Sequence, residues 1–206
     1  SPDELLAIVK EKKAQAKELL AQDLPEFPKA PKLWRVRDAE GRFIRPQTLK
    51  GKFVMTMLSR VDAQKGIGLK VKFVRRVMEQ YPDVYFIGAG GGDQVLMAEL
   101  NRLMKDFPGR CGYTNGPVSN QDPSDIFYLI LLAGDVFLAF SIWEPGGISP
   151  MEALALAAVN LVTDVQGHKS TVRSIDLPDL GILAGTAPNG ARFPFDEFGA
   201  NAEQKT

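Results

Sequence analysis

The sequence predicts a doubly wound α/β fold, in which helices cover both faces of a parallel sheet. Four short runs are apolar with few interruptions, as is typical of strands buried on both faces. These runs alternate with helical patterns, and strict alternation implies right-handed crossovers between parallel strands. Three of the four loops at the expected carboxyl ends of strands carry more than one glycine, and ligands bind at that edge of such sheets.

The elements of this sheet can be assigned in chain order. The expected strands are Phe53–Leu58, Val84–Ile87, Asp135–Phe140 and Asn160–Thr163. The expected helices between them are Ile67–Gln80, Gln94–Asp106, Ser124–Leu132 and Ser149–Ala158. The loops to inspect for ligand binding are therefore Ser59–Gly66, Gly88–Asp93, Gly112–Asp122 and Ser141–Gly147.

Segments with a different character flank the expected sheet. Residues Asp3–Ala21 place leucine, valine and alanine at helical spacing among charged residues, which predicts an amphipathic surface helix. A connector with four prolines follows, with a short hairpin expected near Glu40 and Gly41 and no chemistry. The tail from Thr171 to Thr206 is interpreted as a strand or two plus loops. We divide the chain into a helix and connector (1–50), a ligand-binding domain (51–199) and a C-terminal tail (200–206).

The composition narrows the function classes. A chain of 206 residues with 45% hydrophobic positions can bury one substantial core. Lys+Arg and Asp+Glu both total 25, and no long basic run exists to neutralise nucleic acid. No apolar stretch is long enough to span a bilayer. A single cysteine, Cys111, excludes an intrachain disulfide and is expected to be a buried thiol, so we expect a cytoplasmic location. The abrupt charged start suggests an excised piece of a longer polypeptide.

Two cations follow the first expected strand. Arg60 and Lys65 lie in the loop Ser59–Gly66, at the mouth of the helix that begins near Ile67. A helix N-terminus favours anions, and a forked guanidinium with a mobile ammonium makes a plausible diphosphate clamp. Taken alone, the same pair is more often a solvated surface feature.

The loop after the second strand is a glycine cluster, Gly88–Asp93. Glycine lets backbone approach a phosphate closely. The spacing is not that of a dinucleotide-binding motif. A turn chosen only for its left-handed geometry explains the cluster equally well.

Two carboxylates flank the start of the helix after the third expected strand. Glu144 lies in the polar turn that ends the strand, and Glu152 lies eight positions later in the first helical turn, after Gly146 and Gly147. In one interpretation, both acids face a single cleft. In the other, Ser149 caps the helix and Glu152 only complements its dipole. Glu144 is harder to explain structurally, since an unsolvated carboxylate is costly unless something binds it.

Together these residues resemble a known family. A Glu-x7-Glu pair around Pro-Gly-Gly, the Ser-Arg-x-x-x-Gln-Lys-Gly loop and the Gly-Ala-Gly-Gly-Gly-Asp turn are similar to the C-terminal donor domain of retaining GT-B glycosyltransferases. The resemblance runs from about Lys52 to Gly199. It is strongest to the glycogen and starch synthases, which have segments similar to Asp106–Arg110 and Phe193–Phe198.

The resemblance implies a role for each site residue. Arg60 and Lys65 would hold the donor diphosphate and stabilise the charge on the leaving nucleotide, with Glu144 accepting hydrogen bonds from donor-sugar hydroxyls. The other implied roles are backbone N–H donation to sugar or phosphate by Gly146, Gly147 and Ile148, binding of the ribose hydroxyls by Glu152, and stacking on the base by Tyr113. The family needs no metal, so no cofactor is expected beside the nucleotide-sugar substrate, of the ADP- or UDP-glucose type.

The chain departs from glycogen synthases at several positions. Those enzymes commonly have Cys at the position of Gly146, Arg at that of Ile142 and Tyr at that of Glu152. The last difference leaves the nucleotide and the sugar open. His168, the single histidine, is expected in a surface or phosphate-adjacent loop within Asp164–Lys169, and not as a catalytic base.

The resemblance also implies a partner domain. An N-terminal domain would bind the glycan or small-molecule acceptor, and without it the fragment should transfer little or nothing. Two alternatives stay open: a non-catalytic nucleotide- or carbohydrate-binding module, and a sugar phosphorylase or epimerase of the same fold.

Overall fold

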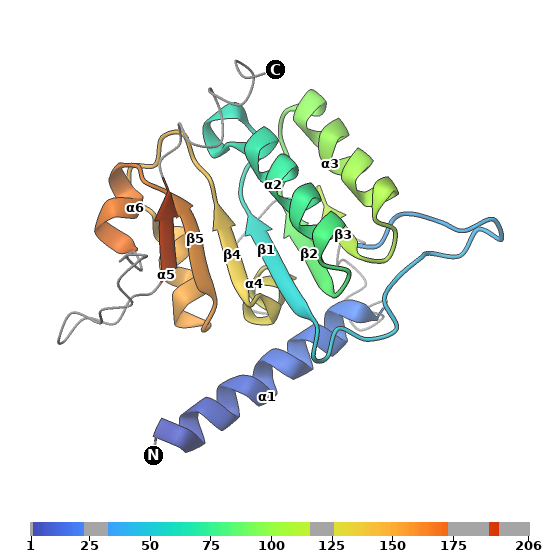
Figure 1. Cartoon of the computed structure of the whole chain (residues 1–206), viewed down its shortest axis with the longest axis horizontal. Helices are drawn as coiled ribbons and strands as arrows, with labels where there is room; N and C mark the ends of the chain where they lie inside the picture. The colour runs from blue at the N-terminus through green and yellow to red at the C-terminus, as the bar shows by residue number, and fades with distance from the viewer. Residues whose placement is uncertain (1, 23–32, 116–125, 173–189, 194–206) are drawn as a thin grey trace.

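The computed structural model describes residues 2–22, 33–115, 126–172 and 190–193, and its centre is a six-stranded parallel sheet (Figure 1). The strands run in the spatial order β3-β2-β1-β4-β5-β6. Their bounds are β1 Phe53–Leu58, β2 Val84–Ala89, β3 Cys111–Thr114, β4 Val136–Ala139, β5 Val159–Thr163 and β6 Gly190–Phe193. This order places the switch in direction between β1 and β4, where doubly wound sheets bind ligands.

The helices are α1 Pro2–Ala21, α2 Ile67–Gln80, α3 Gln94–Asp106, α4 Ile126–Ala133, α5 Ile148–Ala155 and α6 Gln166–Thr171, with a 3-10 turn, η1, at Ala63–Lys65. The predicted doubly wound α/β fold is confirmed. The expected bounds of β1, α2 and α3 coincide with those observed. The sequence reasoning did not identify β3 or α6. Much of the tail, and the start of the helix expected from Ser124, lie outside the described residues.

Helix α5 is shorter than expected. It ends at Ala155, and two residues later Ala157 adopts a left-handed φ of 59°, so the chain has already turned away from the helix. The turn leads directly into β5, which begins at Val159.

The sheet separates two apolar layers. Along β1 the side chains alternate, with Val54 and Leu58 packing among α1 and α4 residues and Met55 and Met57 packing among α2 and α3 residues. This explains why the run is apolar except for the buried Thr56, as expected for a strand covered on both sides.

Helix α1 lies under the amino ends of the strands, as Figure 1 shows. The Lys17 ammonium forms an ion pair of 2.7 Å with Asp135, which precedes β4, and donates to the carbonyl of Lys52, which precedes β1. Asp135 also accepts a hydrogen bond from the N–H of Val54. The helix is thus fixed to the edge of the sheet opposite the carboxyl ends of the strands.

Smaller expectations are also met. Arg37 and Phe43 form an antiparallel bridge around a turn in which Gly41 donates to the carbonyl of Asp38, so the hairpin near Gly41 is confirmed. Cys111 is buried and free of disulfide bonds. Among the described residues, no helix has both the length and the apolar character required to cross a membrane.

Candidate functional site

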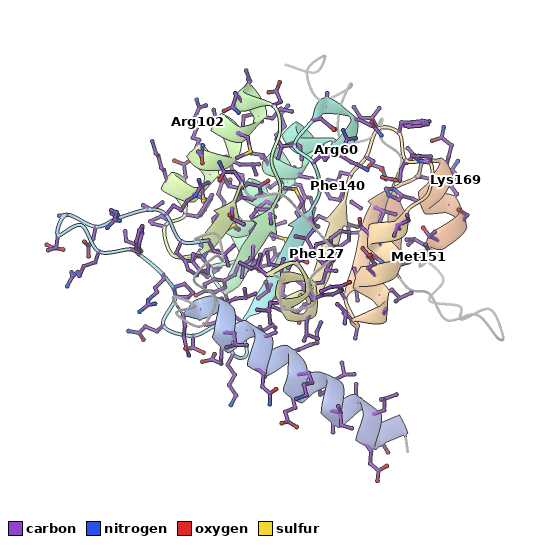
Figure 2. The ribbon with its side chains drawn as sticks, turned by 180° about the vertical axis from the view of Figure 1, so that it is seen from behind. Arg60, Arg102, Phe127, Phe140, Met151 and Lys169 are labelled. Carbon is purple, nitrogen blue, oxygen red and sulfur yellow. The ribbon has the colours of Figure 1, made fainter. Side chains whose placement is uncertain are left out.

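A pocket of about 330 Å³ opens at the carboxyl edge of the sheet, between the loops after β1 and β4. Its apolar floor comes from the strand ends and α4, through Leu58, Phe137, Leu138 and Phe127. Its polar lining includes Arg60, Lys65, Glu144 and Glu152, the four charged side chains that the sequence singled out. The structure therefore brings both predicted cations and both predicted carboxylates to one pocket. Figure 2 shows Arg60 and Phe140 at this edge, remote from α1.

The loop after β1 is held against the loop after β4 by backbone contacts. The N–H of Ile142 donates to the carbonyl of Gln64 at 2.7 Å, and the Gln64 side-chain amide donates to the carbonyl of Trp143 at 3.1 Å. Gly66 makes this approach possible, since it has a φ of 60° and a Cβ there would lie 1.8 Å from the carbonyl oxygen of Phe140. The glycine after Lys65 thus fixes the distance between the cation loop and the carboxylate loop.

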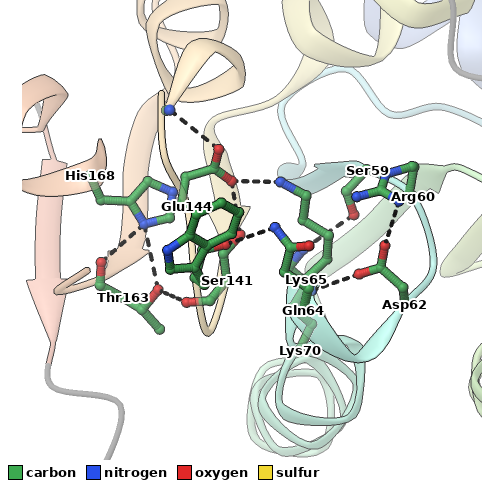
Figure 3. A network of polar contacts seen from close by, with 12 residues as sticks. Ser59, Arg60, Asp62, Gln64, Lys65, Lys70, Ser141, Glu144, Thr163 and His168 are labelled. Carbon is green, nitrogen blue, oxygen red and sulfur yellow. Dashed lines mark hydrogen bonds and ion pairs between the residues drawn. The ribbon is translucent and has the colours of Figure 1, made fainter. Parts of the chain in front are cut away.

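Lys65 and Glu144 form the centre of the polar network in Figure 3. Their ammonium and carboxylate are 2.6 Å apart, and both side chains are largely buried. The Glu144 carboxylate also accepts from the Ser141 hydroxyl at 3.1 Å and from the Gly147 N–H at 3.3 Å. Burial alone would raise the pKa of Glu144, but the hydrogen bond and charge of Lys65, aided by these donors, outweigh it and lower that pKa. Glu144 is therefore an anion stabilised by three hydrogen bonds from the protein itself.

Arg60 is the more exposed of the two cations. Its side chain is 70% exposed and lies 3.2 Å from the Asp62 carboxylate. Asp62 in turn accepts from the N–H of Lys65 at 2.9 Å and so caps η1. An exposed guanidinium with one weak ion pair can swing toward an anion in the pocket at little cost.

The amino end of α5 forms another wall of the pocket. The helix begins at Ile148 after Gly147 and has no side-chain cap, so of the two open interpretations the one in which Ser149 caps the helix is wrong on that point. Ile148, Ser149 and Glu152 line the pocket. The Gly147 N–H already donates to Glu144, which removes it from the donors available to a ligand in this arrangement.

The glycine cluster after β2 has a structural explanation. Gly90 has a φ of 148°, and a Cβ on it would lie 1.8 Å from the carbonyl oxygen of Ser59. The N–H of Val61 donates to the carbonyl of Gly91, and that of Asp93 donates to the carbonyl of Val61. Of the two readings left open by the sequence, the structure favours a tight turn: the cluster supports the Arg60 loop from behind and is absent from the described lining of the pocket.

Two expectations about aromatic side chains are wrong. Tyr113 is 0% exposed and its hydroxyl donates to the carbonyl of Gly90 at 2.7 Å, so it is part of the core and cannot stack on a base. His168 is also 0% exposed and lies in α6, not in a surface loop. Its Nδ1 is 3.0 Å from the carbonyl oxygen of Thr163, and burial lowers its pKa.

Lys70 is a pocket residue that the sequence reasoning missed. It lies on α2 and lines the pocket, yet only 2% of it is exposed. The sequence does contain a signal for this residue, because Lys70 falls on the same helical face as the buried Ile67, Val71 and Val74. A lysine on the apolar face of a helix that directly follows a loop with two cations is a candidate binding residue.

Comparisons with known proteins agree with this geometry. The family described as glycosyl transferases group 1 matches residues 41–176. A glycogen synthase of Desulfatibacillum aliphaticivorans is 29% identical over 152 residues, which cover 72% of this chain and 28% of that enzyme. The catalytic domain of starch synthase IV from Arabidopsis thaliana, bound to ADP and acarbose, aligns with a TM-score of 0.58 at 18% identity, over 95% of this chain and 35% of that one. An Anabaena protein in complex with UDP-glucose aligns with a TM-score of 0.53 at 19% identity, over 71% of this chain and 36% of that one.

The fold and the site define a Rossmann-like, GT-B type domain with a polar pocket at its switch point. The chain belongs to the group 1 glycosyl transferases, because that family matches well over half of its length. Within the family it is glycogen-synthase-like. It spans 28% of the length of the glycogen synthase described above.

Proposed function

We propose that this chain is the nucleotide-sugar-binding domain of a retaining glycosyltransferase that uses an ADP- or UDP-glucose type donor. The observation that supports this most directly is the meeting of Arg60 and Lys65 with the amino end of α5 at one pocket. Two cations and a helix N-terminus provide positive potential for a diphosphate.

The cations would act mainly on the leaving group. When the bond from the sugar to the diphosphate breaks, negative charge accumulates on the nucleotide, and preorganised cations lower the energy of that state. Lys65 is held in place by Glu144 and Arg60 can close over the ligand, so one cation is fixed and the other is adaptable. Because these side chains supply positive charge themselves, we propose that no metal cofactor takes part.

The two carboxylates would bind hydroxyl groups. Glu144 has accepted three protein hydrogen bonds but remains in the pocket lining, where a carboxylate oxygen can accept a further bond from a donor-sugar hydroxyl. Glu152 lines the pocket one helical turn into α5 and would bind the ribose hydroxyls. Gly146 and Ile148 would contribute backbone N–H groups to the sugar or phosphate.

The acceptor would bind a second domain. We propose that a glycan or small-molecule acceptor reaches this pocket through an N-terminal domain that closes over the donor, since closure excludes water and completes such sites. Alone, the chain would bind donor and transfer little or nothing. The single buried thiol, Cys111, is compatible with our proposal that the protein acts in the reducing cytoplasm.

Calorimetric titration tests the proposal. We expect ADP or UDP to bind the wild-type chain, and we expect Arg60→Ala and Lys65→Ala each to weaken that binding about tenfold or more, as for the loss of a charge-assisted hydrogen bond. Arg102→Ala, on the exposed side of α3 remote from the pocket (Figure 2), is the control and should bind like wild type. If neither nucleotide bound at millimolar concentration, the proposal would fail.

A further inference from the structure

Lys70 stands out among the described residues because its charge is buried at the pocket without a counter-ion. Its helix neighbours on the same face are apolar, and the residue is 2% exposed. The only hydrogen bond of its side-chain ammonium within the described part of the chain is a long one, 3.4 Å, to the hydroxyl of Ser59. A buried ammonium without a carboxylate partner is expensive, which is why buried lysines are rare.

The charged groups around Lys70 do not compensate it. Lys65 from η1 and Arg60 from the β1 loop line the same pocket and add positive charge. The carboxylate of Asp62 interacts with Arg60, and that of Glu144 is paired with Lys65. A further titratable neighbour, His168 from α6, is itself buried, and the charge of Lys70 acts against its protonation.

We propose that Lys70 is a third phosphate-binding group, at the floor of the pocket, which takes up a proton from solvent when the diphosphate of the donor enters. This inference rests on the proposed function, because it assigns a further residue to the same donor site. A diphosphate brings the anionic partner that the ammonium lacks. The neutral amine gains one proton and one positive charge: an N–H bond forms as the proton leaves water or a buffer acid, and no bond of the donor breaks.

The electrostatics of the empty pocket favour this coupling. Burial, and after it the charge of Lys65, lower the pKa of Lys70 to about 7, while Asp62 and Glu144 offset this only in part. At neutral pH a large fraction of the side chain is therefore uncharged. An anion at hydrogen-bond distance favours the ammonium form and so raises the pKa. Binding and protonation are then thermodynamically linked.

Calorimetry of anion binding in two buffers measures the linkage directly. ADP and inorganic pyrophosphate are titrated at pH 7.5 in buffers with different ionisation enthalpies, into wild type, Lys70→Met and Lys70→Gln. The control is Lys72→Met, an exposed lysine on the same helix. The dependence of the heat on the buffer gives the number of protons taken up. Protons released by the phosphates themselves are common to all variants and cancel in the comparison.

We expect both Lys70 variants to bind pyrophosphate and ADP about tenfold or more weakly than wild type. We also expect them to take up about three quarters of a proton less at pH 7.5, because Lys70 can no longer be charged on binding. In the absence of ligand, Lys70→Met should unfold at a higher temperature than wild type, since a buried amine is replaced by an apolar chain. A lysine with a merely structural role would show no change in proton uptake, whereas Lys72→Met should match wild type throughout.

Each outcome decides the matter. If a folded Lys70 variant bound ADP and pyrophosphate as tightly as wild type and with the same proton uptake, this inference would be overturned and the donor-binding function would stand. If wild type bound pyrophosphate in a Lys70-dependent way but bound neither ADP nor UDP, the inference would stand and the proposed function would fall. If wild type bound none of these anions, both would be wrong.

Discussion

At the scale of single residues, the central feature of the pocket is the Lys65 ammonium, which interacts with the Glu144 carboxylate and would also have to interact with a bound phosphate. In the empty pocket its ammonium is 2.6 Å from the Glu144 carboxylate, and that carboxylate also accepts from Ser141 and Gly147. A phosphate entering the pocket must share Lys65 with Glu144, so the carboxylate both positions the lysine and repels the incoming anion. Glu144 therefore improves the preorganisation of Lys65 but lowers the affinity of the pocket for a phosphate.

Replacing Glu144 by Gln tests this balance between preorganisation and affinity. The variant keeps a similar shape but removes the negative charge, so we expect inorganic pyrophosphate to bind several-fold more tightly, with the free energy of unfolding reduced by about 1–3 kcal/mol. Calorimetry and chemical denaturation measure the two effects. Glu79→Gln, an exposed residue on α2, should change neither. Unchanged or weaker pyrophosphate binding in Glu144→Gln would show that Glu144 does not compete for Lys65.

The pH dependence of stability tests the burial of Lys70. Its pKa is about 7 in the folded chain and near 10.5 when unfolded, so between these values the unfolded chain binds more protons. Stability then rises with pH, by up to about 1.4 kcal/mol per pH unit from this group. The destabilising effect of Lys70 is full below pH 7 and is lost as the pH approaches 10.5. Relative to Lys70→Met, the wild type should therefore gain stability from pH 7 to 10 in denaturant titrations. A constant difference between the two proteins would contradict the buried, partner-free placement.

The sequence identified single residues where charge and loop position coincided. Arg60, Lys65, Glu144 and Glu152 were found because each follows or opens an expected element at the carboxyl edge. Lys70 was missed because lysines inside helices are usually solvated, and only its position among apolar neighbours distinguishes it. Tyr113 was misassigned because its strand, β3, was not recognised, and a tyrosine in a loop looks available for stacking.

At the scale of elements, the β1 loop and the β4 loop form one unit because Gly66 lets their backbones touch. The Gly66 Cα hydrogen faces the carbonyl of Phe140, where a side chain has no room. The bond from the Ile142 N–H to the Gln64 carbonyl closes the same contact. The distance between Lys65 and Glu144 therefore depends on a residue that contacts no ligand.

Gly66→Ala should separate the two loops. Gly51→Ala is a matched control, because Gly51 also has a left-handed φ, 73°, but a Cβ there meets nothing within 4 Å. Both substitutions carry the left-handed strain of about 1 kcal/mol, and only Gly66→Ala adds the clash with Phe140. We expect a loss of about 3 kcal/mol or more for Gly66→Ala in denaturant titrations, together with weaker ADP binding. Equal losses for the two variants would refute the role given to Gly66.

Long periodic elements were predictable and short ones were not. Helices α2 and α3 have buried faces at helical spacing, and β1 is a run that is apolar except for Thr56, so their bounds follow from the sequence. Strand β3 has four residues, one of them glycine, and is identified only by its pairing with β2. Helix α6 has six residues, with no side-chain cap and glycine in its first turn, and no local pattern indicates it.

At the scale of the whole molecule, the polar contacts that hold α1 and the residues that line the pocket lie at opposite edges of the sheet. The amino edge holds α1 through Lys17 and Asp135, while the carboxyl edge holds the pocket. The fold class followed from alternation alone, because parallel strands bring successive loops to one edge. The side chains that those loops carry then indicated the family. The match to the group 1 glycosyl transferases over residues 41–176 confirms it.

The most direct measurement is a crystal structure of the chain soaked with ADP-glucose and, separately, with UDP-glucose. We expect the diphosphate between Arg60, Lys65 and the amino end of α5, with the Lys70 ammonium within hydrogen-bond distance of a phosphate oxygen. We also expect sugar hydroxyls at Glu144 and ribose hydroxyls at Glu152. A donor bound elsewhere on the surface, or one whose phosphates lie away from Arg60 and Lys65, would contradict these expectations.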